Sequence, residues 1–136
     1  MASPDPAGFD APYPEDAYQG APELLVESAA LMQMSTALRV DWQGAGGLAA
    51  EREYRLRLAA LADRTALFAE ALNPTGQAAA EQEAEAVRAA WDLFTWDRDH
   101  PDGVAGPHDP GSMEWDPSQR PYVRQEYHAW KGNRNA

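Results

Sequence analysis

The chain has 136 residues, no cysteine, and 22 acidic against 11 basic residues, for a formal net charge of −11. This length has room for one domain, and the lack of cysteine excludes disulfides and cysteine-containing zinc sites. No apolar run approaches the ~18 residues of a membrane span, and no leader of the signal-peptide type opens the sequence. The negative charge argues against coating of nucleic acid, because binding phosphates requires clustered Lys and Arg. The abundance of Ala and Arg, with one Lys and no Ile, is typical of a high-GC bacterium.

Prolines divide the chain into arms and a body. They cluster near both ends, and only Pro74 lies between the two groups. Since proline breaks helix interiors, the stretches around Pro74 are free to be helical. The predicted parts are an acidic Pro- and aromatic-rich arm over 1–21, a helical body over 22–98, a Pro/Gly/Asp loop over 99–120 and a basic aromatic segment over 121–136.

The first predicted helix covers about 22–41. Leu24, Leu31 and Leu38 repeat every seven residues. Further apolar residues widen this stripe until most of the helix is apolar, which is typical of a helix buried on several sides. Glycine-rich residues 44–47 end the helix, because glycine is costly in a helix and favoured in a turn.

The second and third helices are predicted over about 48–72 and 74–97, the third with Asn73 as N-cap and Pro74 in its first turn. A 4-3-4-3 spacing defines one apolar face on each helix. These faces are Tyr54, Leu58, Leu61, Thr65, Phe68 and Leu72, then Ala80, Ala84, Val87, Trp91 and Phe94. We expect them to form the core of an all-α, up-down-up three-helix body. Because a body this small is marginal alone, the aromatic arms should fold back on it or dock on a partner.

The turn Trp42-Gln43-Gly44 resembles that of the small WXG helical-hairpin proteins exported by type VII secretion. The resemblance covers about 22–72 and implies two antiparallel helices, pairing of hairpins, and a role as a secreted partner or adaptor. The string from Tyr122 to Glu126 matches the family's export signal, a Tyr with an acidic residue four positions on. The third helix and both arms are additional to that hairpin. An ordinary helical turn with a buried tryptophan is the alternative interpretation.

No motif indicates catalysis. Residues 44–49 fit G-x-G-x-x-A, but a dinucleotide site needs a preceding strand, and the preceding residues are predicted helical. A simple anion site at that helix start stays an alternative. The chain has no G-x-S-x-G elbow, no P-loop and no cysteine nucleophile. The sequence therefore favours a non-catalytic protein and predicts no cofactor.

The loop after the third helix is rich in carboxylates and imidazoles. His100, His108 and Asp99 could ligate a transition metal. An EF-hand register fails, because Pro101 and Asp102 occupy positions that need an acidic residue and a glycine. Asp, Gly and Pro are also typical of solvated turns. The favoured interpretation is no metal, and a metal-binding or enzyme domain using His100 to Asp109 is the alternative.

The C-terminal segment alternates basic and aromatic residues, and a short helix is predicted over about 121–131. Its members are Arg120, Arg124, Lys131 and Arg134 with Tyr122, Tyr127, His128 and Trp130. Such a pattern can bind single-stranded nucleic acid or an acidic protein surface, including the chain's own helices. The negative body favours protein contact.

The sequence thus predicts a small acidic protein–protein interaction module: an adaptor, inhibitor or accessory subunit that binds a protein partner or itself. We expect it in the cytoplasm, or exported without a cleaved signal peptide if it is WXG-like. A further alternative is a DNA mimic, with carboxylates of the third helix and the 97–116 loop imitating phosphates. The predicted interaction residues are Trp42, Gly44, Leu24, Leu31, Leu38, Tyr122, Tyr127 and Trp130.

Overall fold

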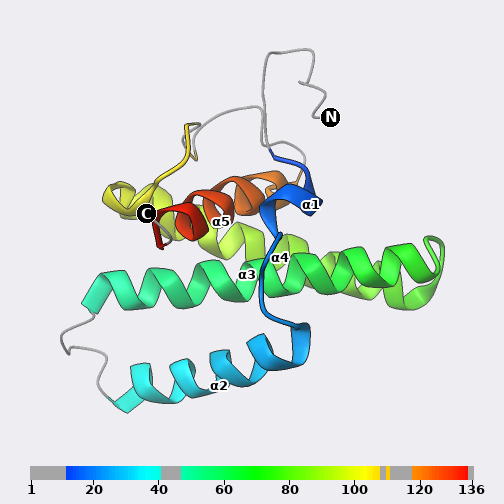
Figure 1. The fold of residues 1–136 in the computed structure, drawn as a ribbon, viewed down its shortest axis with the longest axis horizontal. Helices are drawn as coiled ribbons and strands as arrows, with labels where there is room; N and C mark the ends of the chain where they lie inside the picture. The colour runs from blue at the N-terminus through cyan, green and yellow to red at the C-terminus, as the bar shows by residue number, and fades with distance from the viewer. Residues whose placement is uncertain (1–11, 41–46, 108–109, 111–117, 135–136) are drawn as a thin grey trace.

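The chain is helical, without strands, in the residues that the computed structural model describes: 12–40, 47–107, 110 and 118–134. The elements are α1 (Pro14–Ala17), α2 (Leu24–Val40), α3 (Gly47–Leu72), α4 (Gln77–Asp99), the 3-10 turn η1 (Pro101–Gly103) and α5 (Arg120–Arg134) (Figure 1). The predicted all-α class is confirmed. None of these described helices is long and apolar enough to cross a membrane.

The third predicted helix begins later than the sequence indicates. Residues 73–76 form a turn in which the Gly76 amide donates to the Asn73 carbonyl (3.0 Å). Gly76 is the N-cap of α4, so Asn73 is not the cap and Pro74 lies in the turn. The prediction was wrong here because the fixed φ of proline suits a turn as well as a first helical position.

α3 and α4 form a long antiparallel hairpin, with the most extensive helix contact among the described elements (Figure 1). The buried sides of both helices are rich in alanine, and small side chains allow helices to pack closely. The buried alanines are Ala59, Ala60, Ala66, Ala79, Ala86 and Ala90. Larger apolar side chains enter the core mainly where α5 crosses the hairpin.

α5 completes the core and is longer than the predicted 121–131 segment. Three of its residues, each at most 2% exposed, join the core: Tyr122, Val123 and Tyr127. α2 packs on α3, and Leu31 is its one buried apolar residue among those described. The core therefore consists of α3, α4 and α5, and the predicted three-helix body over 22–98 is incomplete without α5.

Residues 12–22 form a strap that folds back over α5. The strap contains α1, which starts at Pro14 because proline fits a first helical position; the sequence predicted an extended arm here. Lys131 on α5 donates to the carbonyls of Asp16 (3.2 Å) and Gln19 (2.7 Å). These bonds join the strap to the far end of the chain.

Candidate interaction surface

α3 has two sides, and the apolar face predicted as core is the less buried one. The buried side consists of Arg52, Leu56, Ala59, Ala60, Asp63 and Ala66. On the predicted face, Phe68 is 59% and Leu72 is 72% exposed. The prediction was wrong because it followed the larger apolar side chains, and because charged residues are normally exposed. In this protein the alanines fit a close seam and the buried charges are paired.

α4 shows the same reversal. Its buried side consists of Ala79, Ala86, Ala90, Leu93, Phe94 and Asp97. Of the predicted face only Phe94 is buried. Ala80 and Ala84 are exposed, Val87 is half-buried and Trp91 is 48% exposed. The close α3–α4 seam thus leaves a second apolar stripe on α4 facing outward.

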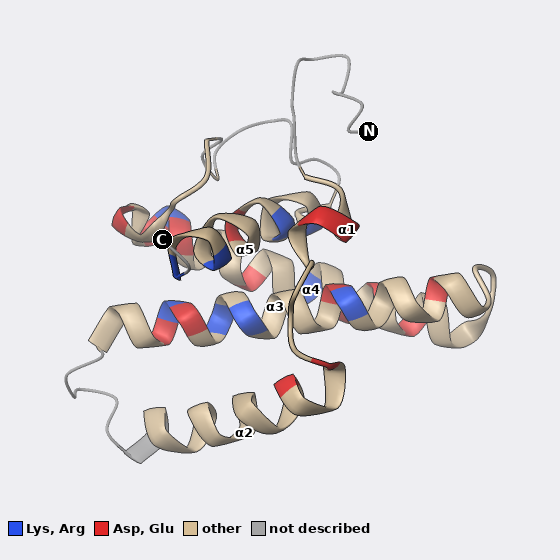
Figure 2. Ribbon diagram, in the orientation of Figure 1, with Lys and Arg blue, Asp and Glu red and all other residues tan. Residues whose placement is uncertain are grey.

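α2 exposes apolar side chains outside its buried contact with α3. Leu25 is 78% and Met32 is 71% exposed, and Val26 is exposed beside them. Between Leu24 and Leu38 every exposed side chain is uncharged: Leu25, Val26, Ala29, Met32, Gln33, Thr36 and Ala37. Figure 2 shows this contrast, since α2 is nearly free of charge while α3 alternates acidic and basic residues. Contiguous apolar patches of this kind mark interaction sites on soluble proteins.

A groove of about 270 Å³ separates α2 from α3. Its walls include Leu31 and Met32 from α2 and Leu58 and Leu61 from α3. The outer stripe of α3 continues this apolar lining toward Leu72. We call the exposed side chains on both helices the α2–α3 apolar surface: Leu25, Val26, Met32, Leu58, Phe68 and Leu72.

One ion pair fixes α2 against α3. The guanidinium of Arg57 donates twice to the buried carboxylate of Glu27, from Nε and Nη2 at 2.8 Å each, and once to Glu53 (2.9 Å). The hydrogen bonds to Glu27 raise the pKa of Arg57 above its usual value, against the opposing effect of burial. This bidentate pair sets the register of α2 on α3 and adds to the packing of the buried Leu31.

A second buried cluster joins α3, α4 and α5. Arg52 donates to both oxygens of Asp97 (2.9 and 2.8 Å) and to Glu126 Oε1 (2.8 Å). Tyr122 donates its hydroxyl to Asp97 Oδ2 (2.7 Å). Burial alone would lower the pKa of Arg52, but the bonds to Asp97 and Glu126 raise it. Burial raises the pKa of Tyr122, and the two carboxylates add to this effect.

Glu126 also holds the loop after η1. Its carboxylate accepts the amides of Ala105 and Gly106 (2.8 Å each) and the side-chain amide of Gln125 (2.8 Å). Two carboxylates face one guanidinium here, so these neutral donors compensate the excess negative charge. A full set of partners is typical of a structural ion cluster rather than of a reactive site.

Asp63 anchors the basic C-terminal segment to α3. Its buried carboxylate accepts from Arg120, from Arg124 (2.8 and 2.9 Å) and from the hydroxyl of Tyr18 (2.6 Å). Burial alone would raise the pKa of Asp63, but Arg124, Tyr18 and Arg120 hold it below its usual value. Two of the positive charges considered for nucleic acid are therefore bound inside the chain.

The aromatic residues predicted for interaction lie mostly inside the protein. Tyr122 and Tyr127 belong to the core. Trp130 is half-buried between the guanidiniums of Arg57 (5.6 Å) and Arg134 (4.7 Å). Glu126 is also fully buried, so the Tyr–acid string that resembles an export signal is inaccessible in the folded chain.

The leucine repeat of α2 lies on its less exposed side, with Leu31 buried and Leu24 and Leu38 half-buried. Trp42 and Gly44 fall outside the described residues. The sequence analysis did not identify the outer residues of α2 as the exposed ones. A signal was available, because α2 is apolar nearly all round, whereas the core contacts only one side of it.

The candidate metal ligands that lie in the described residues do not converge on one point. His100 stacks on Trp96 (ring centres 4.0 Å apart), with Nδ1 2.9 Å from the Trp96 carbonyl oxygen. Asp99 is exposed beside it, and His108 lies outside the described residues. Within the described part of the chain, no three His, Asp or Glu side chains are arranged to hold a metal ion.

Comparisons with known proteins give no relative. No family model, curated protein or solved structure matches this chain. The turn that carries the resemblance to WXG proteins lies outside the described residues, so that kinship stays a prediction. The geometry of the chain's own surface carries the functional proposal.

Proposed function

We propose that this chain is a non-catalytic helical interaction module that binds a partner protein through the α2–α3 apolar surface. The observation that carries the proposal is that the exposed side chains of α2 between Leu24 and Leu38 are all uncharged, with Leu25 and Met32 more than two-thirds exposed, in a chain of net charge −11. Burying one large apolar side chain contributes about 1.5–3 kcal/mol. A small number of such residues is enough to anchor a partner.

The shape of the surface favours a helical segment of the partner. α2 and α3 lie antiparallel beside one another (Figure 1), and the groove between them is lined by residues spaced along both helices. An amphipathic helix binds such a groove with apolar residues at positions i, i+3, i+4 and i+7. An adaptor, inhibitor or accessory subunit in the cytoplasm would use this mode, and so would an exported hairpin of the WXG type.

The experiment compares the double variant Leu25→Glu, Met32→Glu with the control Ala78→Glu, which adds charge at an exposed position of α4. Each tagged protein is returned to its host, and the proteins that co-purify are quantified. We expect the double variant to lose, at least tenfold, a companion that wild type and control retain. Its free energy of unfolding should stay within about 0.5 kcal/mol of wild type, because both side chains are exposed.

Retention of the same companions by the double variant would refute the α2–α3 apolar surface as the binding site. A large loss of stability in the double variant would also contradict the proposal, because it would mean that Leu25 and Met32 hold α2 in place. Unfolding is followed by the far-ultraviolet circular dichroism of the helices.

A further inference from the structure

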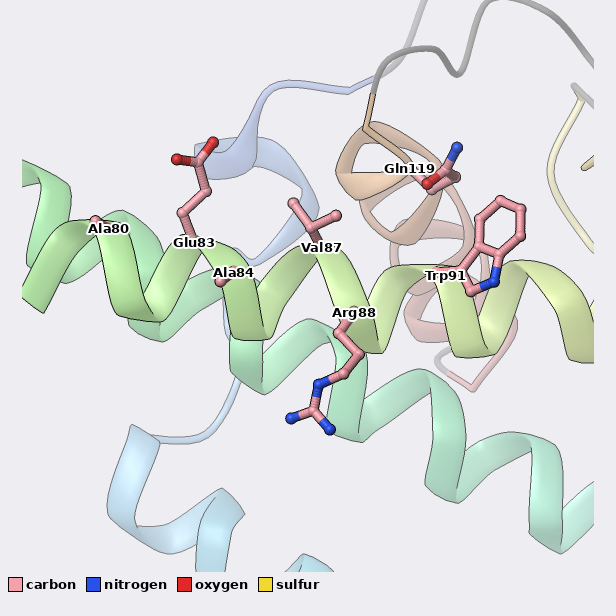
Figure 3. A pocket seen from close by; sticks show the side chains of 7 residues that line it. All are labelled: Ala80, Glu83, Ala84, Val87, Arg88, Trp91 and Gln119. Carbon is pink, nitrogen blue, oxygen red and sulfur yellow. The ribbon is translucent and has the colours of Figure 1, made fainter.

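The outward stripe of α4 lines an open groove of about 790 Å³. Ala80, Ala84, Val87 and Trp91 follow the spacing i, i+4, i+7, i+11, so they form one line along the helix. Figure 3 shows Val87 and Trp91 on the same side of α4, with Gln119, the residue before α5, beside Trp91. This groove is separate from the α2–α3 apolar surface, since its lining comes from α4 and the residue before α5.

The side chains of the stripe become larger toward the C-terminal end of α4. Its large members, Val87 and Trp91, are near the C-terminal end of α4, and its small members, Ala80 and Ala84, are near the other end. A twofold axis crossing α4 between residues 85 and 86 would place Trp91 opposite Ala80 of a second copy, and Val87 opposite Ala84. Each large side chain would then meet a small one, which is the complementarity that close helix packing requires.

The charges beside the stripe obey the same symmetry. Glu81 and Arg88 are seven residues apart, so they lie on the same flank of α4. In an antiparallel pair, equivalent flanks face each other, and Arg88 of each copy would lie within reach of Glu81 of the other. Arg88 is well exposed and pairs with Glu85, so its guanidinium can also accommodate a second carboxylate.

The charge of the groove favours a second copy as its occupant. Its lining has one acidic residue, Glu83, and one basic residue, Arg88, so its net charge is zero in a chain of −11. A groove suited to a basic partner would be acidic. Two copies of an acidic chain approach each other at least cost through a neutral patch.

We propose that a second copy of this chain docks on the α4 groove and forms an antiparallel, twofold homodimer. Such an interface is isologous, with the same patch used by both copies. It leaves the α2–α3 apolar surface of each copy free, so the dimer would display two of them. The inference does not depend on the proposed function, because it rests on other residues.

Sedimentation equilibrium over a wide range of concentration tests the proposal. The mass should rise from 14.9 kDa toward twice that value. Glu81→Arg and Arg88→Glu each replace two attractive contacts by two repulsive ones, and each should raise the dimer dissociation constant roughly tenfold. The double reversal should restore wild-type dimerisation, and a mixture of the two single variants should form a heterodimer, because all pairs are then opposite in sign.

Matched controls distinguish an effect at this interface from a general effect of net charge and from an effect at the α2–α3 apolar surface. Glu15→Arg on α1 changes the net charge as Glu81→Arg does and should leave the dissociation constant unchanged, as should Leu25→Glu with Met32→Glu. Trp91→Ala should weaken the dimer at least tenfold, with circular dichroism used to verify the fold. A monomer at every concentration, or a double reversal as weak as the single ones, would overturn the proposal.

Discussion

The α3–α4–α5 core buries alanines and paired charges, whereas α2 and the outer stripe of α3 keep leucines, a phenylalanine and a methionine in solvent. In the core, Arg52 and Asp63 each bind groups from other helices. α2 contributes one buried carboxylate, Glu27, which pairs with Arg57, and one buried apolar side chain, Leu31. The contrast teaches that large apolar side chains are divided between two places: Leu56, Leu93 and Tyr122 are among those that build the core, whereas those of α2 and of the outer stripe of α3 stay exposed.

The largest expected effect is the loss of Arg52. In Arg52→Ala the carboxylates of Asp97 and Glu126 stay buried without their cation, which should cost about 3–5 kcal/mol of unfolding free energy. Arg88→Ala is the control, because the Arg88 and Glu85 side chains are 66% and 56% exposed and such a surface pair is worth less than about 1 kcal/mol. Urea titration of both variants measures the difference. Equal losses would show that the core cluster contributes no more than a surface pair.

A smaller effect is expected from two matched glycine substitutions. A Cβ on Gly106 would lie 2.2 Å from Nε2 of Gln125, so Gly106→Ala should displace the amide that serves Glu126 and destabilise the chain by about 1–3 kcal/mol. A Cβ on Gly132 in α5 meets nothing within 4 Å. Gly132→Ala should therefore stabilise the chain by up to about 1 kcal/mol. Thermal denaturation distinguishes the two, and shifts of the same sign would contradict the described geometry of the loop.

The third expected effect concerns the slope of the unfolding free energy against pH. Burial raises the pKa of Tyr18, Tyr122 and Tyr127. Each therefore stabilises the fold fully below the unfolded pKa of about 10, and this contribution is lost as the pH rises from there toward the folded pKa. Unfolding free energy should fall above pH ~10, and in Tyr122→Phe the fall should be shallower by up to about 1.4 kcal/mol per pH unit. Parallel curves for the two proteins would contradict the buried, protonated state of Tyr122.

The sequence was sufficient for the helices and insufficient for their faces. Proline and glycine positions, with apolar spacing, locate α2, α3 and α4 to within a few residues. They could not show that the α3–α4 seam consists of alanine, because the wider stripes of Leu58 and Trp91 give the stronger hydrophobic signal. Close packing of two helices depends on the distance between their axes, which no local pattern encodes.

The ion clusters are harder still to predict. Arg52 and its partner Glu126 are 74 residues apart, and Asp63 binds Arg120 from 57 residues away. In the sequence these residues look like any solvated charge, and only the fold brings them together. The candidate site had a partial signal, since α2 is too apolar for a helix that the core contacts on one side. Its outer residues could be assigned only once the position of α3 was known.

The strap has a chemical consequence, because Lys131 is the only lysine in the chain. Its amino group donates to the carbonyls of Asp16 and Gln19, so the one side-chain amine is also a structural contact. The rate at which an acylating reagent labels Lys131 therefore reports how firmly these two hydrogen bonds hold the amine. Acetylation would remove the positive charge of that amine and weaken the link between the two ends of the described chain.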